Sequence, residues 1–172
     1  MRLKVTIAAA VVVVGLTSTY ALAAKGGQSD LAKARQATAA YHNVADAEAA
    51  GYASTLDSLG CFENPGVGGM GLHYLREDLL DDEVDGATPE ALVYEMSANG
   101  KLKLVGHEYI VPIDAWTGAE PPMLFDQQFH AHPVLPFYVL HAWVWHPNPD
   151  GMFVDWNPKV RECPAGVPVF GA

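Results

Sequence analysis

Short apolar runs separated by turn residues fill the chain between residues 70 and 146, and they constrain the fold more than any other feature. The runs are Met70–Arg76, Ala91–Ser97, Lys101–Pro112, Met123–Phe129 and Phe137–His146. Such runs, rich in β-branched and aromatic residues, are typical of strands. Asn99-Gly100 joins the second run to the third, and this dipeptide between apolar runs favours a hairpin. We therefore expect a mainly antiparallel sheet that can curl toward a barrel.

One helix is expected before the sheet, over residues 30–50. This segment contains neither Gly nor Pro, and its apolar residues recur at helical spacing. Ser29 or Asp30 can cap the start of the helix, and Gly51 follows its end. The predicted fold class is therefore α+β, with an N-terminal amphipathic helix packed on the sheet.

The first 23 residues have the pattern of a secretory signal peptide. Arg2 and Lys4 precede an apolar run, and Ala21-Leu22-Ala23 fits a cleavage site. An uncleaved membrane anchor is the alternative, but the run is short for a span of about 20 residues. We expect a secreted or periplasmic protein without a membrane span after cleavage. Residues 24–29 would form a flexible leader, and residues 30–172 a single domain.

Two cysteines, Cys61 and Cys163, are present in the whole chain. In an oxidising compartment such a pair is expected to form one disulfide. Metal thiolates or a redox couple are the alternative, although the pair lacks the CxxC spacing typical of both.

The chain is acidic, with a net charge of −10 that becomes −12 once Arg2 and Lys4 are removed with the signal peptide. This balance argues against nucleic acid and anionic membranes as partners, because phosphate binding needs clustered Lys and Arg. Six of the acids lie between Glu77 and Asp85. A solvated loop explains them better than a calcium loop, because Leu92 occupies the twelfth position, where a bidentate Glu is needed.

Alternation along the strands identifies candidate metal ligands. In the third run, Glu108 shares a parity with Leu102, Leu104 and Ile110, which predicts an inward carboxylate that needs a partner. His141 lies among large apolar residues of its run. His73 and His130 belong to two further strands or strand ends. His132 shares the parity of His130, which is preferred because it is nearer its strand.

Three imidazoles and one carboxylate suit a divalent transition metal, namely Zn, Fe, Cu, Mn or Ni. The predicted metal site is thus His73, Glu108, His130 and His141. The alternative is that each histidine forms hydrogen bonds within the core. His107 has the opposite parity to Glu108 and is expected to face solvent.

Aromatic residues beside these positions suggest a pocket for a small-molecule ligand, although they can equally fill the core. The expected lining residues are Tyr74, Phe137, Trp143 and Trp145. Nucleophile motifs such as GxSxG, phosphate-binding loops and dinucleotide fingerprints are absent from the sequence.

Several motifs together resemble a group of uncharacterised secreted bacterial proteins. They are Gly60-Cys61-Phe62, Gly68-Gly69-Met70-Gly71-Leu72-His73-Tyr74, Pro89-Glu90-Ala91-Leu92-Val93-Tyr94-Glu95, Val105-Gly106-His107-Glu108-Tyr109, Leu140-His141-Ala142-Trp143, Gly151-Met152-Phe153 and Trp156-Asn157-Pro158. The resemblance spans nearly all of the mature chain and implies the extent of the domain, but it implies no activity.

The sequence therefore favours an exported protein that binds a divalent transition metal, and whether it is an enzyme stays open. Two alternatives remain: a metal-free module that binds a small ligand, and an envelope interaction protein with a core histidine network.

Overall fold

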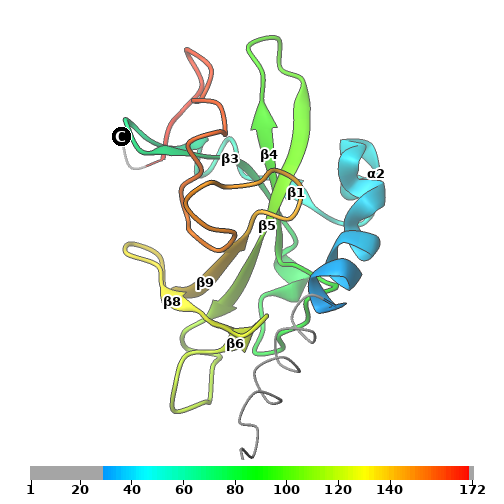
Figure 1. Cartoon of the computed structure of the whole chain (residues 1–172), viewed down its shortest axis with the longest axis vertical. Coiled ribbons are helices and arrows are strands. Elements are labelled where there is room, and N and C mark those ends of the chain that lie inside the picture. The colour runs from blue at the N-terminus through cyan, green and yellow to red at the C-terminus, as the bar shows by residue number, and fades with distance from the viewer. Residues whose placement is uncertain (1–28, 171–172) are drawn as a thin grey trace, which may run out of the picture.

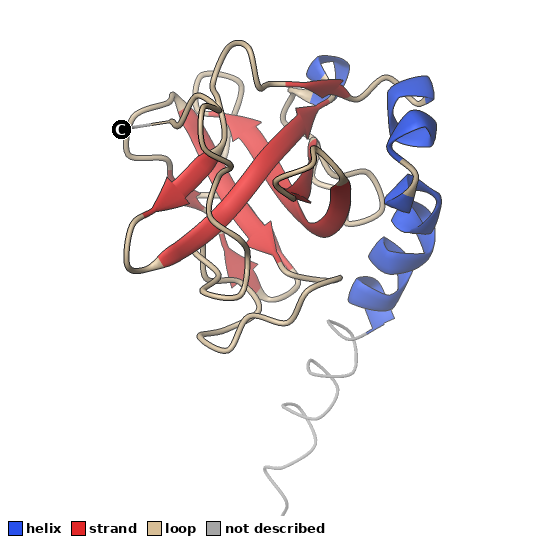
Figure 2. Ribbon diagram, turned by 90° about the horizontal axis from the view of Figure 1, so that it is seen from above, coloured by secondary structure: helices blue, strands red, loops and turns tan. Residues whose placement is uncertain are grey.

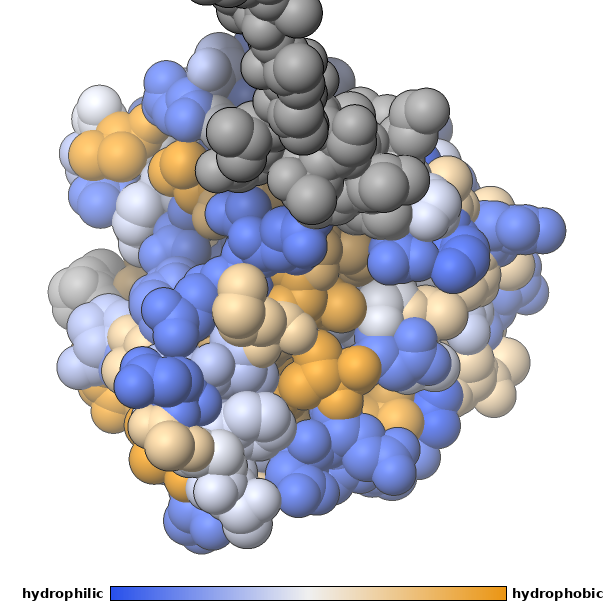
Figure 3. Space-filling view, turned by 60° about the horizontal axis from the view of Figure 1, so that its bottom comes forward, coloured by the Kyte–Doolittle hydropathy of each residue, from blue (hydrophilic) through white to orange (hydrophobic). Residues whose placement is uncertain are grey.

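The computed structural model describes residues 29–170 (Figure 1). The predicted signal peptide and residues 24–28 of the predicted leader lie outside this part of the chain. Within residues 29–170 no helix is both long and apolar enough to cross a membrane. Hydrophilic residues cover most of the described surface visible in Figure 3, with smaller apolar patches between them.

A seven-stranded antiparallel sheet forms the body of the protein. Its strands are β1 (Ala53–Ser54), β2 (Phe62–Asn64), β3 (Gly68–Leu75), β4 (Ala91–Met96), β5 (Leu102–Pro112), β8 (His130–Ala131) and β9 (Phe137–Ala142). They lie in the order β1-β3-β4-β5-β9-β8, and β2 also pairs with β3. The antiparallel sheet is as predicted. No pairing within residues 29–170 closes it into a barrel, so the barrel-like feature is not confirmed.

The helical segment lies on one side of this sheet (Figures 1 and 2). It is an α-helix over residues 29–38, continues as the 3-10 helix η1 (Ala39–His42) and resumes as α2 (Val44–Ala49). The predicted continuous helix is therefore interrupted at Asn43, whose backbone is extended. The Asn43 side chain accepts a hydrogen bond from the Ala45 amide, so this residue caps α2.

The turns follow local chemistry, with one departure from the expectation. Gly100 has a φ of 77° in the turn between β4 and β5, as the Asn-Gly signal predicted. The expected strand Met123–Phe129 is instead a small hairpin of β6 (Met123–Leu124) and β7 (Gln127–Gln128). Phe125 and Asp126, with φ of 54° and 61°, form its turn. Two successive positive φ values give the type I′ geometry that suits two-residue hairpin loops.

The acidic segment behaves as a solvated loop. It contains the short 3-10 helix η2 (Glu77–Leu79), and all six of its acidic side chains are exposed.

Both faces of the sheet are covered. On the helix face, Ala34 packs with Tyr109 and Val111, and Ala47 packs with Leu104. On the opposite face, the segment that follows β9 packs Val160 against Val105 and Trp143. This second face is where three of the four predicted metal ligands, His73, Glu108 and His141, meet.

A β-bulge in β5 changes the faces that simple alternation predicts. Val93 pairs with Gly106 whereas Tyr94 pairs with Leu104, so Val105 is one extra residue in β5. Leu104 therefore faces the helix, while Glu108 faces the opposite side. The expectation that these two side chains share a face was wrong, because it assumed an unbroken period of two.

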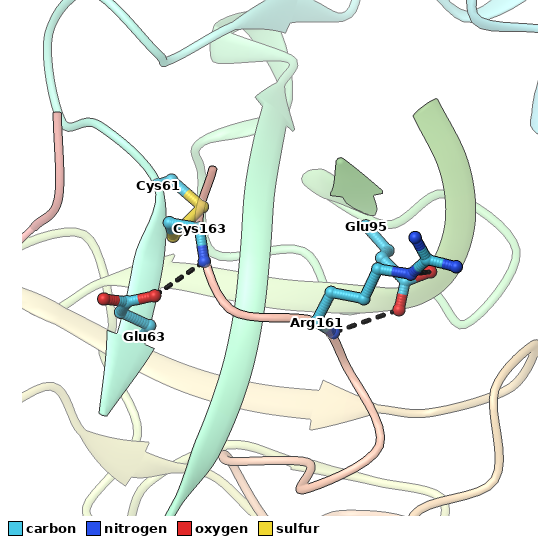
Figure 4. Close-up of a disulfide and its surroundings, with 5 residues drawn as sticks. All are labelled: Cys61, Glu63, Glu95, Arg161 and Cys163. Carbon is cyan, nitrogen blue, oxygen red and sulfur yellow. Dashed lines mark hydrogen bonds and ion pairs between the residues drawn. A yellow bond between two sulfur atoms is a disulfide. The ribbon is translucent and has the colours of Figure 1, made fainter. Parts of the chain in front are cut away.

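Covalent and polar contacts fasten the C-terminal segment to the sheet (Figure 4). The predicted disulfide joins Cys61 to Cys163. Glu63 accepts a hydrogen bond from the Cys163 amide at 2.6 Å, and Glu95 accepts one from the Arg161 amide at 3.0 Å. These contacts hold the segment across the second face.

Candidate metal centre

Strand register brings His73, Glu108 and His141 together. Glu108 on β5 pairs directly with His141 on β9. On the other side of Glu108, its partner in β4 is Ala91. Val93, two residues after Ala91 in β4, pairs with His73 in β3. Neighbouring strands present paired residues on the same face, so all three side chains point to one side of the sheet.

The donor atoms of these three side chains all lie within 4.8 Å of one another. His73 Nε2 is 3.1 Å from Glu108 Oε2, and His141 Nε2 is 3.7 Å from Glu108 Oε1. The side chains of His73, Glu108 and His141 are only 5%, 10% and 2% exposed. A buried cluster of two imidazoles and one carboxylate can hold a metal ion.

Hydrogen bonding leaves part of this cluster unsatisfied. His73 Nδ1 and both ring nitrogens of His141 are buried and form no hydrogen bond within the described chain. The 3.7 Å separation of His141 Nε2 from Glu108 exceeds ordinary hydrogen-bond lengths. An unsatisfied buried polar atom costs about 1–3 kcal/mol, so these nitrogens favour an additional bound group.

Asp155 extends the cluster from the C-terminal segment. Its Oδ1 lies 3.5 Å from His141 Nδ1, which is an ion-pair distance without good hydrogen-bond geometry. Its Oδ2 lies 3.1 Å from His130 Nε2. A carboxylate behind a histidine ligand orients the ring and raises its basicity. The sequence analysis missed Asp155, because this residue lies in a loop without periodicity.

The ionisation of these groups reflects their mutual attraction. Burial acts to raise the pKa of Glu108, but nearby His141 and His73 outweigh it and hold the pKa at about 2. Burial likewise opposes ionisation of Asp155, yet His130 and His141 lower its pKa. Burial acts to lower the pKa of His141, but the two carboxylates raise it overall. The Glu108 carboxyl is therefore ionised at neutral pH, which is the form that can bind a metal ion.

Two histidines that the sequence analysis considered do not join the cluster. His130 is 46% exposed and contacts Asp155 instead. His132 accepts hydrogen bonds at Nδ1 from the amides of Val134 and Leu135. Its Nε2 therefore carries the proton in the neutral ring and offers no lone pair to a metal.

The expectation that His107 faces solvent was wrong. It is fully buried on the helix face, where Thr38 Oγ1 lies 2.9 Å from Nε2. The Tyr109 hydroxyl lies 3.3 Å from Nδ1. Burial lowers the pKa of His107 to about 3, so the ring is neutral. Strand alternation alone could not reveal this burial, because it is the helix that covers the face of the strand that would otherwise meet water.

A cavity of about 340 Å³ adjoins the cluster. Glu108, His141 and Asp155 form part of its lining, and its apolar wall includes Phe62, Met70, Trp156 and Phe170.

None of the four aromatic residues predicted to line a pocket borders this larger cavity. Tyr74 packs against Tyr94 on the helix face, and Trp145 contacts His42. Trp143 is buried, and its indole donates to the Val154 carbonyl. Phe137 lines a second cavity of about 50 Å³, on the side of the cluster that His73 borders.

Comparison with known proteins identifies no relative. No family model matches the chain, and neither a curated protein nor a solved structure matches it.

Proposed function

We propose that this chain is an exported protein that binds one divalent transition metal ion through His73, Glu108 and His141. The convergence of three buried donors from three strands is the observation that carries the proposal. Asp155 supports it, because a carboxylate behind His141 is the usual partner of a histidine that ligates a metal.

The donor set narrows the choice of metal without selecting one. Two imidazoles and a carboxylate suit Zn, Fe, Mn, Cu or Ni better than Ca or Mg, which prefer oxygen ligands. Three protein ligands leave coordination positions for water or a small molecule. The adjoining cavity, which Glu108 and His141 help to line, can supply that molecule. A metal bound there would act as a Lewis acid or a redox centre.

Export is the part of the proposal that rests on the start of the sequence and on the cysteines. The Cys61–Cys163 disulfide suits an oxidising compartment. The resemblance to secreted bacterial proteins also favours export. The disulfide and the resemblance agree with a signal peptide in the first 23 residues.

Metal analysis of the mature protein, purified without a histidine tag and reconstituted with zinc, iron(II) or manganese(II), tests the proposal. We expect close to one equivalent of one metal. His73→Ala and His141→Ala should each remove most of it, because either change leaves only two protein ligands. His42→Ala is the matched control, since His42 is exposed on the helix side. Stoichiometric binding that persists in both ligand variants would refute this site.

Thermal unfolding with and without a chelator separates this function from a metal-free ligand-binding module. Metal binding adds to folding free energy, by about 4 kcal/mol at a thousandfold excess over Kd. Chelation should therefore lower the melting temperature of the wild type and leave His141→Ala unchanged. Equal responses of the two proteins would favour the metal-free alternative.

A further inference from the structure

The size and the apolar lining of the cavity beside the cluster are those of a small-molecule site. At about 340 Å³ it lies within the range of small-molecule sites, which is roughly 300–1,000 Å³. Phe62 and Phe170 stack with ring centroids 4.5 Å apart, and Trp156 and Met70 extend the apolar lining. One part of the cavity is therefore suited to a flat apolar group.

His132 supplies a hydrogen-bond donor to the same cavity. Two backbone amides, those of Val134 and Leu135, occupy its Nδ1 at 3.1 and 2.9 Å. This arrangement leaves the proton on Nε2, as argued above. His132 lines the cavity together with Glu108 and His141, so a residue with an N–H donor forms part of the cavity wall. The natural partner of an N–H donor and a metal cation is an oxygen that only accepts hydrogen bonds.

The carboxylates around the cavity disfavour a ligand with more than one negative charge. Glu63, Glu108 and Asp155 all line the cavity, so one bound divalent cation would not neutralise all three carboxylates. Glu63 already accepts a hydrogen bond from the Cys163 amide. His130 lines the same cavity and contacts Asp155, with Nε2 3.1 Å from Oδ2. A dianion such as a phosphate ester would meet more repulsion than a monocarboxylate.

We propose that the cavity binds a small aromatic monocarboxylate, with its carboxylate at the metal and at the His132 N–H and its ring against the aromatic lining. This inference rests on the proposed metal function and names the ligand class of the same site. It also gives His132 a role distinct from metal ligation.

Calorimetric titration of benzoate into the zinc-loaded protein tests the inference. Benzyl alcohol, which keeps the ring, and acetate, which keeps the carboxylate, are the comparison ligands. Benzoate should bind at least ~10-fold more tightly than either, because each lacks one of the two recognised groups. Zinc content is measured separately on every sample.

Variants locate the ligand. His132→Asn keeps an acceptor for the Val134 and Leu135 amides but removes the ring N–H, and it should weaken benzoate binding ~10-fold at unchanged zinc content. Phe170→Ala should weaken benzoate more than acetate. His42→Asn, on the opposite face of the sheet, should change neither.

The outcomes separate the two proposals. Full zinc loading with no preference for benzoate over acetate and benzyl alcohol overturns the ligand class and leaves the metal site standing. Benzoate affinity equal in wild type and His132→Asn overturns the role of His132. A protein that takes up no metal refutes the proposed function, and the metal-anchored carboxylate fails with it.

Discussion

Opening the Cys61–Cys163 disulfide should remove a large part of the stability of this domain. The cysteines are 102 residues apart, so the bond closes most of the folded chain into one loop. For a loop of that length, the lost chain entropy of the unfolded state corresponds to about 4.7 kcal/mol. Domains of this kind are stable by only about 5–15 kcal/mol, so the reduced protein should be marginal. Its melting temperature should fall by roughly 10–20 °C.

Urea unfolding of the oxidised and reduced wild type measures this difference without changing any side chain. Cys61→Ala/Cys163→Ala serves as a second form that cannot reoxidise. Glu95→Gln in β4 is the matched control for the same segment. It keeps an acceptor for the Arg161 amide and weakens only an ion pair with a largely exposed Arg161. That change should cost less than about 1 kcal/mol. Unfolding free energies of oxidised and reduced protein within about 1 kcal/mol of each other would show the loop-entropy reasoning to be wrong.

Three further predictions concern the site and the sheet. Asp155→Ala should lower metal affinity about 10–100-fold in a competition titration, because His141 loses the carboxylate that orients it; unchanged affinity would count against the site. Burial raises the pKa of Glu90 to about 8 from a usual value of 4.5, so the folded state holds a proton that the unfolded state loses between these values. Stability from this group is therefore complete below pH 4.5 and declines by up to about 1.4 kcal/mol per pH unit toward pH 8. Glu90→Gln should flatten that decline in unfolding curves measured at several pH values, and an unaltered slope would contradict the burial argument. Gly71→Ala should destabilise far more than Gly100→Ala, since both glycines have positive φ but only at Gly71 would a new Cβ collide with the Tyr94 carbonyl; equal losses in urea unfolding would refute the clash.

Several features of the fold could be predicted because they depend on neighbours in sequence. Asn99-Gly100 determines a tight turn through its own backbone preference, and the alternating runs on either side form β4 and β5. Two cysteines in an otherwise cysteine-free chain leave a single intramolecular pairing, and the structure contains it. The interruption at Asn43 was also local in origin, but the helical spacing on both sides concealed it.

The candidate site was predicted only in part. His73, Glu108 and His141 were all selected as inward polar residues, and the structure brings these three together. The reasoning for Glu108 nevertheless assumed a regular strand, and the bulge at Val105 places it on the face opposite Leu104. His130 was selected for its nearness to a strand, yet it contacts Asp155 at the edge of the cluster.

Local rules acting on the sequence were sufficient for β3, β4, β5 and β9, the Asn-Gly turn, the disulfide pair and the existence of inward polar residues, because each depends on a few adjacent side chains or on composition. The identity of the cluster depended on contacts between distant segments. Register across β3, β4, β5 and β9 decides which polar residues meet, and a single bulge reverses a face. Asp155 and part of the cavity lining, Trp156 and Phe170, come from a segment that the disulfide and two carboxylates hold across the sheet. No periodicity marks such residues, so their role follows only from where the folded chain places them.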